Sequence, residues 1–239
     1  IYDGSNALQK NNHKFPDFED FKKKGWYKSP ERLSQQVFLK EFIEAPEKKP
    51  LETPSGKIEL FSKQIASFKY SDCVGHPKWY GDKEYLGNVT KYKLHLLSNQ
   101  PKFKLHSQLD NGHVAANEKS DGRAIVEINK VDAEARGISE NMVVRVFNER
   151  GSCLAVVQIS GNIMQGVVNI PTGAWLDPLK RSDISCVHGN PNVLTNDVGT
   201  SKLAQGPTAH TCLVEIEQFN KKVPRIRAFD PPKITAPNK

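Results

Sequence analysis

The sequence has no long apolar run and no local motif of the kinds that identify a membrane helix, a zinc ribbon or a nucleotide loop. No stretch approaches the roughly 20 apolar residues that a membrane helix needs, and no apolar signal region opens the chain. The four cysteines form no CxxC pair, which argues against a zinc ribbon, a local iron–sulfur motif or a disulfide scaffold. We therefore expect each cysteine to be a small buried hydrophobe.

Motifs for metal binding and catalysis are also missing. The seven histidines form no HxH or HExxH pattern, and there is no GxGxxG, Walker or serine-elbow motif. Cys186 and His188 are close in sequence, but no acid that would orient the histidine is evident. We predict no metal ligand and no catalytic residue in this chain.

The composition is that of a globular protein with room for one or two domains. Of 239 residues, 37% are hydrophobic and 26% charged, with a net charge of +7. A basic balance suits an anionic partner such as nucleic acid, a membrane surface or a phosphorylated cofactor. Lysines are interleaved with acidic residues, so a solvated surface is the favoured explanation of each basic cluster. The chain opens without Met, and we expect it to be part of something longer.

The first part of the chain, residues 1–90, predicts an irregular and helical arm. FPDFEDFKKKGWY and SPERLSQQVFLKEFIEAP are typical of short helices broken by prolines, the second with Ser29 as N-cap and Pro30 in the first turn. In residues 57–61, Ile58 and Leu60 alternate with polar neighbours as in a half-buried strand. We expect this arm to pack poorly by itself and to expose Phe, Trp and Leu side chains.

Residues 91–219 change to short β segments. The predicted strands are 92–98, 124–129, 143–148, 153–160, 166–170 and 211–219, with a hairpin turn at 149–151. Asn129 and Asp132 resemble a capping box for a short helix that Gly137 can end. Six short strands with small helices indicate a mainly β fold, a compact barrel with an α/β fringe. Residues 220–239 predict an extended C-terminal tail.

Two polar segments adjoin predicted strands. Residues 98–111 follow the first strand, and a strand exit with lysines nearby offers the N–H groups and cations that a pyrophosphate needs. In residues 188–211, Asn192, Thr195 and Gln205 can pair with a heterocycle, and residues 199–201 are expected to open a short anion-binding helix. Each segment could equally be a polar loop that closes a barrel end.

Six stretches stand in a fixed order along the chain. They are TPSGKIELFSKQIASF, GHPKW, HLLSNQPKFKLHSQLDN, INKVDAEARGI…VRVFNERG, GVVNIPTGAW and GNPNVLTNDVGTSKLAQGPTAHTCLVEIE. In this order they resemble the C-terminal third of bacterial trimethylamine-N-oxide, dimethyl sulfoxide and biotin sulfoxide reductases. The similarity covers residues 50–219, whereas DAEARGI or TPSGKIE alone would indicate only the wider molybdopterin oxidoreductase group.

This resemblance implies a six-stranded double-psi β-barrel that helps to bind two molybdopterin guanine dinucleotides around one molybdenum. Its first cofactor-contact segment would hold Ser98, Asn99, Gln100, Pro101, Lys104, His106, Ser107 and Gln108, and its second Asn192, Ala209 and His210. Lys104 stands where related sequences often have arginine, so a point charge would replace a bidentate contact. The two segments should then meet at one end of the barrel.

By the same resemblance, the chain is a cofactor-binding fragment of a molybdenum oxidoreductase that reduces S- or N-oxides, with trimethylamine N-oxide favoured. The fragment alone is expected to be inactive and without bis(molybdopterin guanine dinucleotide) molybdenum. Expected partners are the missing N-terminal domains, the small oxide and a cytochrome-type electron donor, without nucleic acid or membrane insertion. We expect the periplasm, with the cytoplasm as the alternative.

Two other hypotheses stay open. One is a different molybdopterin enzyme of the formate dehydrogenase or nitrate reductase type, although KLHSQLDN and GTSKLAQGPTAHTCLVEIE favour the oxide reductases. The other is a non-catalytic barrel that binds nucleotides or nucleic acid through its positive charge. Basic and aromatic residues are not interleaved on one strand, which counts against single-strand binding.

Overall fold

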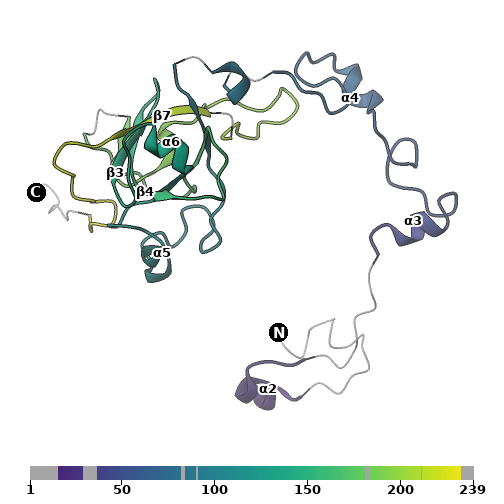
Figure 1. Cartoon of the computed structure of the whole chain (residues 1–239). Coiled ribbons are helices and arrows are strands. Elements are labelled where there is room, and N and C mark those ends of the chain that lie inside the picture. Colours follow the sequence, from purple (N-terminus) through teal and green to yellow (C-terminus); the bar gives the residue numbers. More distant parts are fainter. Residues whose placement is uncertain are drawn as a thin grey trace, which may run out of the picture. The chain divides into compact units, whose positions relative to one another are not determined.

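The computed structural model of the chain describes residues 16–28, 37–81, 84–89, 91–180, 184–210 and 212–232. Backbone contacts divide the chain into two units, residues 1–60 and 61–239, which are described separately (Figure 1). The boundary predicted near residue 90 therefore lies inside the second unit, and the three predicted domains remain a prediction about a longer protein.

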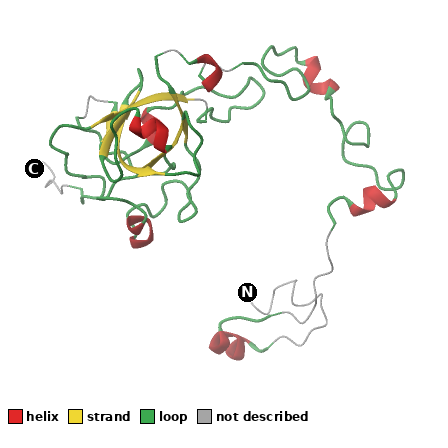
Figure 2. Cartoon of the chain, viewed as in Figure 1, coloured by secondary structure: helices red, strands yellow, loops and turns green. Residues whose placement is uncertain are grey.

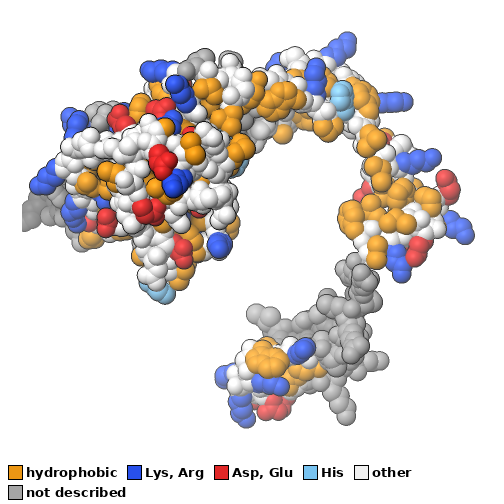
Figure 3. Space-filling view, viewed as in Figure 1, with side chains coloured by type: hydrophobic (Ala, Val, Ile, Leu, Met, Phe, Trp, Pro, Cys, Tyr) orange, Lys and Arg blue, Asp and Glu red, His pale blue; other side chains and the backbone are white. Residues whose placement is uncertain are grey.

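The described residues of the first unit form two short helices, α2 (Phe18–Lys24) and α3 (Lys40–Glu44). The side chain of Asp17 accepts a hydrogen bond from the N–H of Asp20, and Gly25 ends α2 in a left-handed conformation. Both helices lie within the predicted helical stretches, whereas the predicted Ser29 and Pro30 cap lies outside the described residues. Large apolar side chains are exposed here, including Phe38 and Leu60, each 85% exposed, and Figure 3 shows such side chains on the surface.

The strand predicted at residues 57–61 is wrong. These residues form turns and irregular backbone, and Ile58 is 65% exposed. The alternation of apolar and polar residues is local, and no neighbouring segment among the described residues pairs with it. The second unit instead starts with α4 (Lys63–Ser67), capped by the Ser62 side chain, followed by the 3-10 helix η1 (Leu86–Asn88).

All six predicted strands of the second unit are confirmed, each within a residue or two of its predicted ends. They are β1 (Leu94–Leu97), β2 (Ile125–Ile128), β3 (Val143–Phe147), β4 (Ser152–Ile159), β5 (Val167–Asn169) and β7 (Cys212–Gln218). A further two-residue strand, β6 (Ser185–Cys186), pairs in parallel with β4 and was not predicted.

The six strands close into a barrel in the order β2-β5-β1-β7-β3-β4, because β4 also pairs with β2. The pairs β1–β5 and β2–β4 are parallel, and the remaining four pairs of the ring are antiparallel. The strand pairing has an internal twofold symmetry. The pattern of parallel and antiparallel pairs is unchanged when β1 is exchanged with β4, β2 with β5 and β3 with β7. The predicted mainly β fold with a six-stranded double-psi barrel is confirmed.

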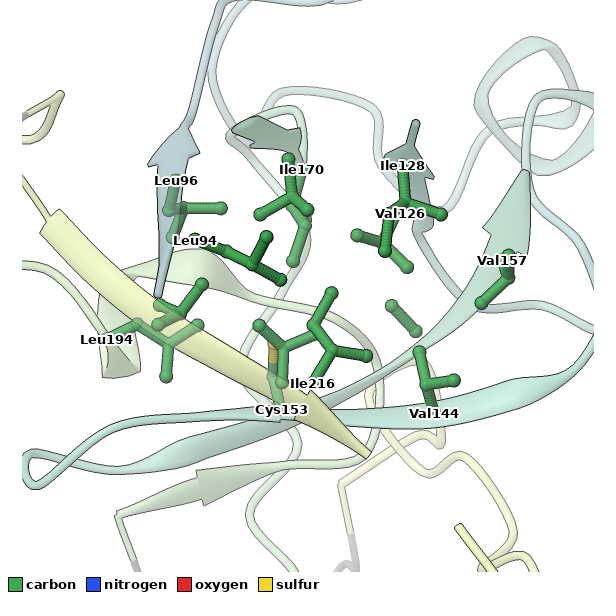
Figure 4. Close-up of a cluster of buried hydrophobic side chains, with 14 of the residues drawn as sticks. Leu94, Leu96, Val126, Ile128, Val144, Cys153, Val157, Ile170, Leu194 and Ile216 are labelled. Atoms are coloured by element: carbon green, nitrogen blue, oxygen red, sulfur yellow. The ribbon is translucent and has the colours of Figure 1, made fainter. Parts of the chain in front are cut away.

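The inside of the barrel is filled by the alternating apolar residues of its strands. Leu94, Val126, Val144, Val168 and Val214, from five different strands, are each 0% exposed. Figure 4 shows side chains of this cluster pointing toward one another from the surrounding strands. The interior is therefore a packed core, and any binding site must lie at the barrel's ends or on its outside.

Among the described residues, two small α-helices accompany the barrel, α5 (His113–Asn117) and α6 (Lys130–Glu134), together with the 3-10 helix η2 (Pro191–Val193). Figure 2 shows α6 across one opening of the ring of strands, where Ala133 joins the core. Asn129 caps α6 as predicted, and Gly137 is left-handed. Asp132 does not complete the capping box, since its carboxylate accepts the N–H of Gly166, 2.6 Å away.

Candidate functional site

Residues of both predicted segments line one hollow of about 350 Å³, called the first hollow. β1 and β5 are parallel neighbours, so the loops that leave their carboxyl ends emerge together. His106 and Ser107 come from the first segment, and Asn192 from the second. The other lining residues are Thr172, Gly173, Ala174, Trp175, Leu176 and Asn190.

A second hollow of about 330 Å³ adjoins the first and shares Thr172 and Ala174 with it. The loop at residues 99–104 forms one wall, and outward-facing side chains of the barrel strands form the floor. These side chains include Glu127 and Gln158, and Glu118 also lines this hollow. The second hollow thus contains carboxylates, whereas the lining of the first hollow has none among the described residues.

The predicted contact residues are divided between these places. His106, Ser107 and Asn192 line the first hollow. Asn99, Gln100, Pro101 and Lys104 line the second hollow. Ser98, Gln108, Ala209 and His210 are outside both linings as far as the structure describes them.

Ser98 and His210 nevertheless contact each other. The N–H of Ser98 donates to Nδ1 of His210, 3.4 Å away, and Nε2 of His95 lies 2.6 Å from the His210 carbonyl oxygen. These bonds tie the exit of β1 to the entry of β7. Ser98 is buried and Gln108 is exposed.

Gly173 allows the two walls of the first hollow to approach closely. Its φ is +97°, a region that favours glycine, and a Cβ at this position would overlap the carbonyl oxygen of His106. The N–H of Thr172 also donates to the carbonyl oxygen of Asn99, 2.9 Å away. The loop after β5 is therefore fixed directly against the first polar segment.

A buried charge cluster around Asp110 adjoins the second hollow, which its partners Lys104 and Lys119 line. Its carboxylate oxygen Oδ1 pairs with the ammonium groups of Lys104 and Lys119, the latter at 2.9 Å. The side chains of all three residues are at most 5% exposed. Lys104, predicted to contact a phosphate, thus already has an anionic partner inside the protein.

Three atoms of Trp175 form hydrogen bonds, with Asp110, His188 and Ser107. Its backbone N–H donates to Oδ2 of Asp110 at 3.0 Å, its carbonyl oxygen accepts from Nδ1 of His188 at 2.9 Å, and its indole N–H donates to the Ser107 carbonyl oxygen at 2.7 Å. Because Trp175 and Ser107 both line the first hollow, the buried cluster sets the position of that wall.

The buried thiol of Cys186 forms hydrogen bonds with the backbone of the same loops. Its sulfur accepts the backbone N–H groups of Asp177, His188 and Asn190, each 3.4 Å away. Cys153, Cys186 and Cys212 are buried as predicted, whereas Cys73 is half-buried, and all four are free. Cys186 is therefore a structural anchor of the first hollow's walls.

The protonation states follow from burial and hydrogen bonding. Burial raises the pKa of Asp110, but hydrogen bonds from Lys104, Lys119 and the Trp175 N–H outweigh it, so the pKa lies below its ordinary value. Burial lowers the pKa of Lys119 despite the Asp110 carboxylate. Burial also lowers the pKa of His188, and Lys119 adds to this effect. His188 is therefore neutral at pH 7, and its Nε2 can accept from Lys119 Nζ at 3.0 Å.

The short helix expected at residues 199–201 is wrong. Gly199 instead forms an isolated bridge with Pro207, and the N–H of Thr200 donates to the Gly206 carbonyl oxygen at 2.9 Å. Gln205, expected to face a ligand, donates to the Ser201 carbonyl oxygen at 2.8 Å. This stretch is a tight loop whose polar groups bond to one another.

Sequence reasoning missed the supporting layer of Asp110, Lys119 and Cys186. Asp110 lies inside the first polar segment, but nothing local shows that its partners are Lys119 and the Trp175 backbone. In the described part of the chain, no three His, Cys, Asp or Glu residues are grouped as a metal site, and no helix is long and apolar enough to cross a membrane.

Comparison with known proteins gives consistent results. The family model described as "Molydopterin dinucleotide binding domain" matches residues 94–213. Biotin sulfoxide reductase of Cereibacter sphaeroides is 42% identical over 219 residues, covering 91% of this chain and 29% of that protein. Trimethylamine-N-oxide reductase 1 of Escherichia coli O157:H7 is 45% identical over 224 residues, covering 91% of this chain and 26% of that protein.

A solved structure, acetylene hydratase from Pelobacter acetylenicus, has a TM-score of 0.59 at 16% identity, covering 73% of this chain and 25% of that chain. This similarity shows the fold alone. The chain spans less than a third of the length of the curated relatives named above. The family match covers half of the chain and includes five of the six barrel strands and the first two residues of β7. The chain belongs to the molybdopterin dinucleotide-binding domain family.

Proposed function

We propose that this chain is the cofactor-binding part of a molybdenum-dependent reductase of S- or N-oxides, with trimethylamine N-oxide as the preferred substrate. The observation that carries the proposal is the first hollow, where His106 and Ser107 of one polar segment face the same space as Asn192 of the other. The named relatives, a biotin sulfoxide reductase and a trimethylamine-N-oxide reductase, support the oxide-reducing class over formate dehydrogenases and nitrate reductases.

The chemistry of the first hollow fits a molybdopterin guanine dinucleotide. This cofactor carries a diphosphate and heterocyclic edges with both donors and acceptors. Hydroxyl, amide and imidazole groups line the hollow, and no carboxylate that would repel a diphosphate is among the described lining residues. Gly173 lets the loop after β5 pack directly against the His106 carbonyl group, since any side chain there would collide with it, and this contact holds the wall of the hollow in place.

In the complete enzyme, the bound molybdenum cofactor would supply oxygen-atom transfer, and this chain would bind and orient it. Asn192, Ser107 and His106 would hold polar edges of the cofactor by hydrogen bonds. The indole of Trp175, fixed by Ser107 and the Asp110 cluster, would exclude water from one side. We propose no catalytic residue and no metal ligand in this chain.

The remaining parts of the proposal concern the whole protein. Residues 1–90 would complete upstream catalytic domains, which would explain why large apolar side chains such as Trp26 and Phe38 are exposed. A cytochrome-type protein would donate electrons, and the enzyme would work in the periplasm, with the cytoplasm as the alternative. The isolated chain would be inactive.

The test uses the full-length protein that contains this chain, produced with molybdate. We expect molybdenum and released guanine-containing pterin in the purified protein, and oxidation of the reduced enzyme by trimethylamine N-oxide. An Asn192→Ala variant should lose about 1 kcal/mol of cofactor binding, or about fivefold in affinity, with the barrel still folded.

The matched control is Asn162→Ala, another exposed asparagine, which lies in the turn between β4 and β5. This variant should keep full cofactor content. Normal cofactor content in Asn192→Ala would remove the site assignment. Oxidation by nitrate in place of the oxides, or activity as a formate oxidase, would replace the proposed substrate class.

A further inference from the structure

The chain after β7 returns to the barrel, where hydrogen bonds and ring contacts hold it next to Trp175, a lining residue of the first hollow. We call residues 224–230 the C-terminal strap. At its start, the buried guanidinium of Arg123 donates to the Pro224 carbonyl oxygen. In its middle, the buried carboxylate of Asp177 accepts the backbone N–H groups of Arg227 and Ala228, the latter at 3.1 Å, and pairs with the Arg227 guanidinium at 3.2 Å.

Phe229, near the end of the strap, contacts the buried layer behind Trp175. Its ring centroid is 5.2 Å from that of Trp175 and 5.0 Å from that of His188, with interplanar angles of 67° and 90°. Lys119 Nζ lies 4.7 Å from the Phe229 ring centroid. One phenyl ring therefore contacts the indole that lines the first hollow and two side chains that support it.

The geometry suits an aromatic side chain in particular. Lys119 shares the single carboxylate of Asp110 with Lys104, so the cluster has one positive charge in excess while His188 is neutral. The negative face of a phenyl ring stabilises an ammonium group that has been removed from water. The edge-on contacts of Phe229 with the rings of Trp175 and His188 add further stabilisation. An aliphatic side chain would supply neither the cation–π contact nor these ring contacts.

We infer that Phe229 is a positioning residue, through which the C-terminal strap holds Trp175 and thereby the wall of the first hollow. The inference rests on the proposed function of that hollow. The strap lies outside residues 94–213, the range matched by the family model.

The test compares four variants of the full-length protein. Two shorten the chain, one ending at Val223 to remove the strap and one ending at Asp230 to keep it. Two others, Phe229→Leu and Phe229→Tyr, remove or retain the aromatic ring. Hydrogen exchange at the backbone N–H group of Trp175 is measured alongside the rate of cofactor release and the midpoint of global unfolding.

We expect exchange at Trp175 to become about tenfold faster or more in the Val223-terminated and Phe229→Leu proteins, because the wall opens locally. Cofactor release should accelerate in the same two proteins. Chains that end at Asp230 or carry Phe229→Tyr should match the parent, and unfolding midpoints of the Phe229 variants should agree.

Unchanged exchange at Trp175 after loss of the strap would overturn the inference. Equal losses in Phe229→Leu and Phe229→Tyr would also overturn it, because the aromatic ring would then have no specific role. Exchange is measured without reference to cofactor, so a parent protein that binds no molybdopterin would refute the proposed function while the exchange data still decide the role of the strap.

Discussion

The backbone N–H of Ser98 and the imidazole Nδ1 of His210 lie 3.4 Å apart, although 112 positions separate the two residues in the chain. In this bond the ring nitrogen of His210 is the acceptor. The contact keeps the loop before β7 beside the loop after β1. It is one of the bonds that place both polar segments at the same end of the barrel.

Gly173→Ala should disrupt the first hollow more than the barrel core. The new methyl group would collide with the His106 carbonyl oxygen at a φ of +97°, and we expect a loss of about 2 kcal/mol in the free energy of unfolding. Urea denaturation of the chain measures this loss. Gly161→Ala is the control, since a Cβ there meets nothing, and it should stay within about 0.5 kcal/mol of the parent.

Asp110→Asn should be strongly destabilising. The variant leaves the ammonium groups of Lys104 and Lys119 buried without an anion, which costs about 3–5 kcal/mol. Denaturant unfolding at pH 7 is the measurement. In contrast, Glu217→Gln breaks an exposed pair with Arg145 and should cost less than about 1 kcal/mol. Similar losses in the two variants would contradict a buried, energetically important cluster.

Stability should fall on mild acidification because of His188. Its pKa is lowered in the folded state, so only the unfolded chain takes up the proton as the pH falls below the ordinary value of about 6.5. The stabilisation is complete above that pH and is lost below it. The free energy of unfolding should therefore decrease as the pH is lowered from 7.5 to 5, and the slope of this decrease is the quantity to measure.

A His188→Phe variant tests the origin of that slope. Removing the titrating ring should reduce the pH dependence by up to about 1.4 kcal/mol per pH unit, the value for one proton. His113→Gln, at an exposed histidine, should keep the parent slope. An unchanged slope in His188→Phe would assign the proton uptake to another group.

Glu84→Gln should weaken the hydrogen bonds that hold the first residues of β7 and so lower the stability of the protein. The Glu84 carboxylate accepts two bonds from Arg150, at 2.7 and 2.8 Å, and one from the Leu213 N–H at 2.8 Å. Burial raises the pKa of Glu84, but these bonds outweigh it and the pKa lies below its ordinary value. We expect a loss of about 2 kcal/mol in unfolding free energy at pH 7.

The effect of Glu84→Gln should disappear in acid, which supplies an internal control. Because the folded pKa is depressed, the stabilisation by the carboxylate is present above the unfolded pKa of about 4.3 and is lost as the pH falls through the folded value. The stability difference between parent and variant should therefore shrink from pH 7 toward pH 3. A constant difference would show that charge is not its cause.

The strands of the barrel could be predicted because each is a local pattern. Leu94 and Leu96 in β1, and Val144 and Val146 in β3, alternate with less buried neighbours, and a period of two is visible in the sequence alone. The same criterion failed at Ile58 and Leu60, where alternation occurs without a partner strand. It also missed β6, whose two residues are too few to show any period.

The order of the strands in the ring cannot be obtained from such patterns. The parallel pairs β1–β5 and β2–β4 join strands that are far apart in the chain, and their pairing depends on closure of the whole barrel. The sequence predicted the barrel topology only through its resemblance to a family. The pairing pattern in the structure then confirmed that topology.

The candidate site divides in the same way. The sequence by itself determined which segments carry amides, hydroxyls and imidazoles. Only the tertiary structure decided that His106 and Asn192 share a hollow, that Asp110 pairs with Lys119, and that Phe229 packs on Trp175. These contacts depend on long-range packing, and one residue in a polar loop has no periodic signal that names its distant partner.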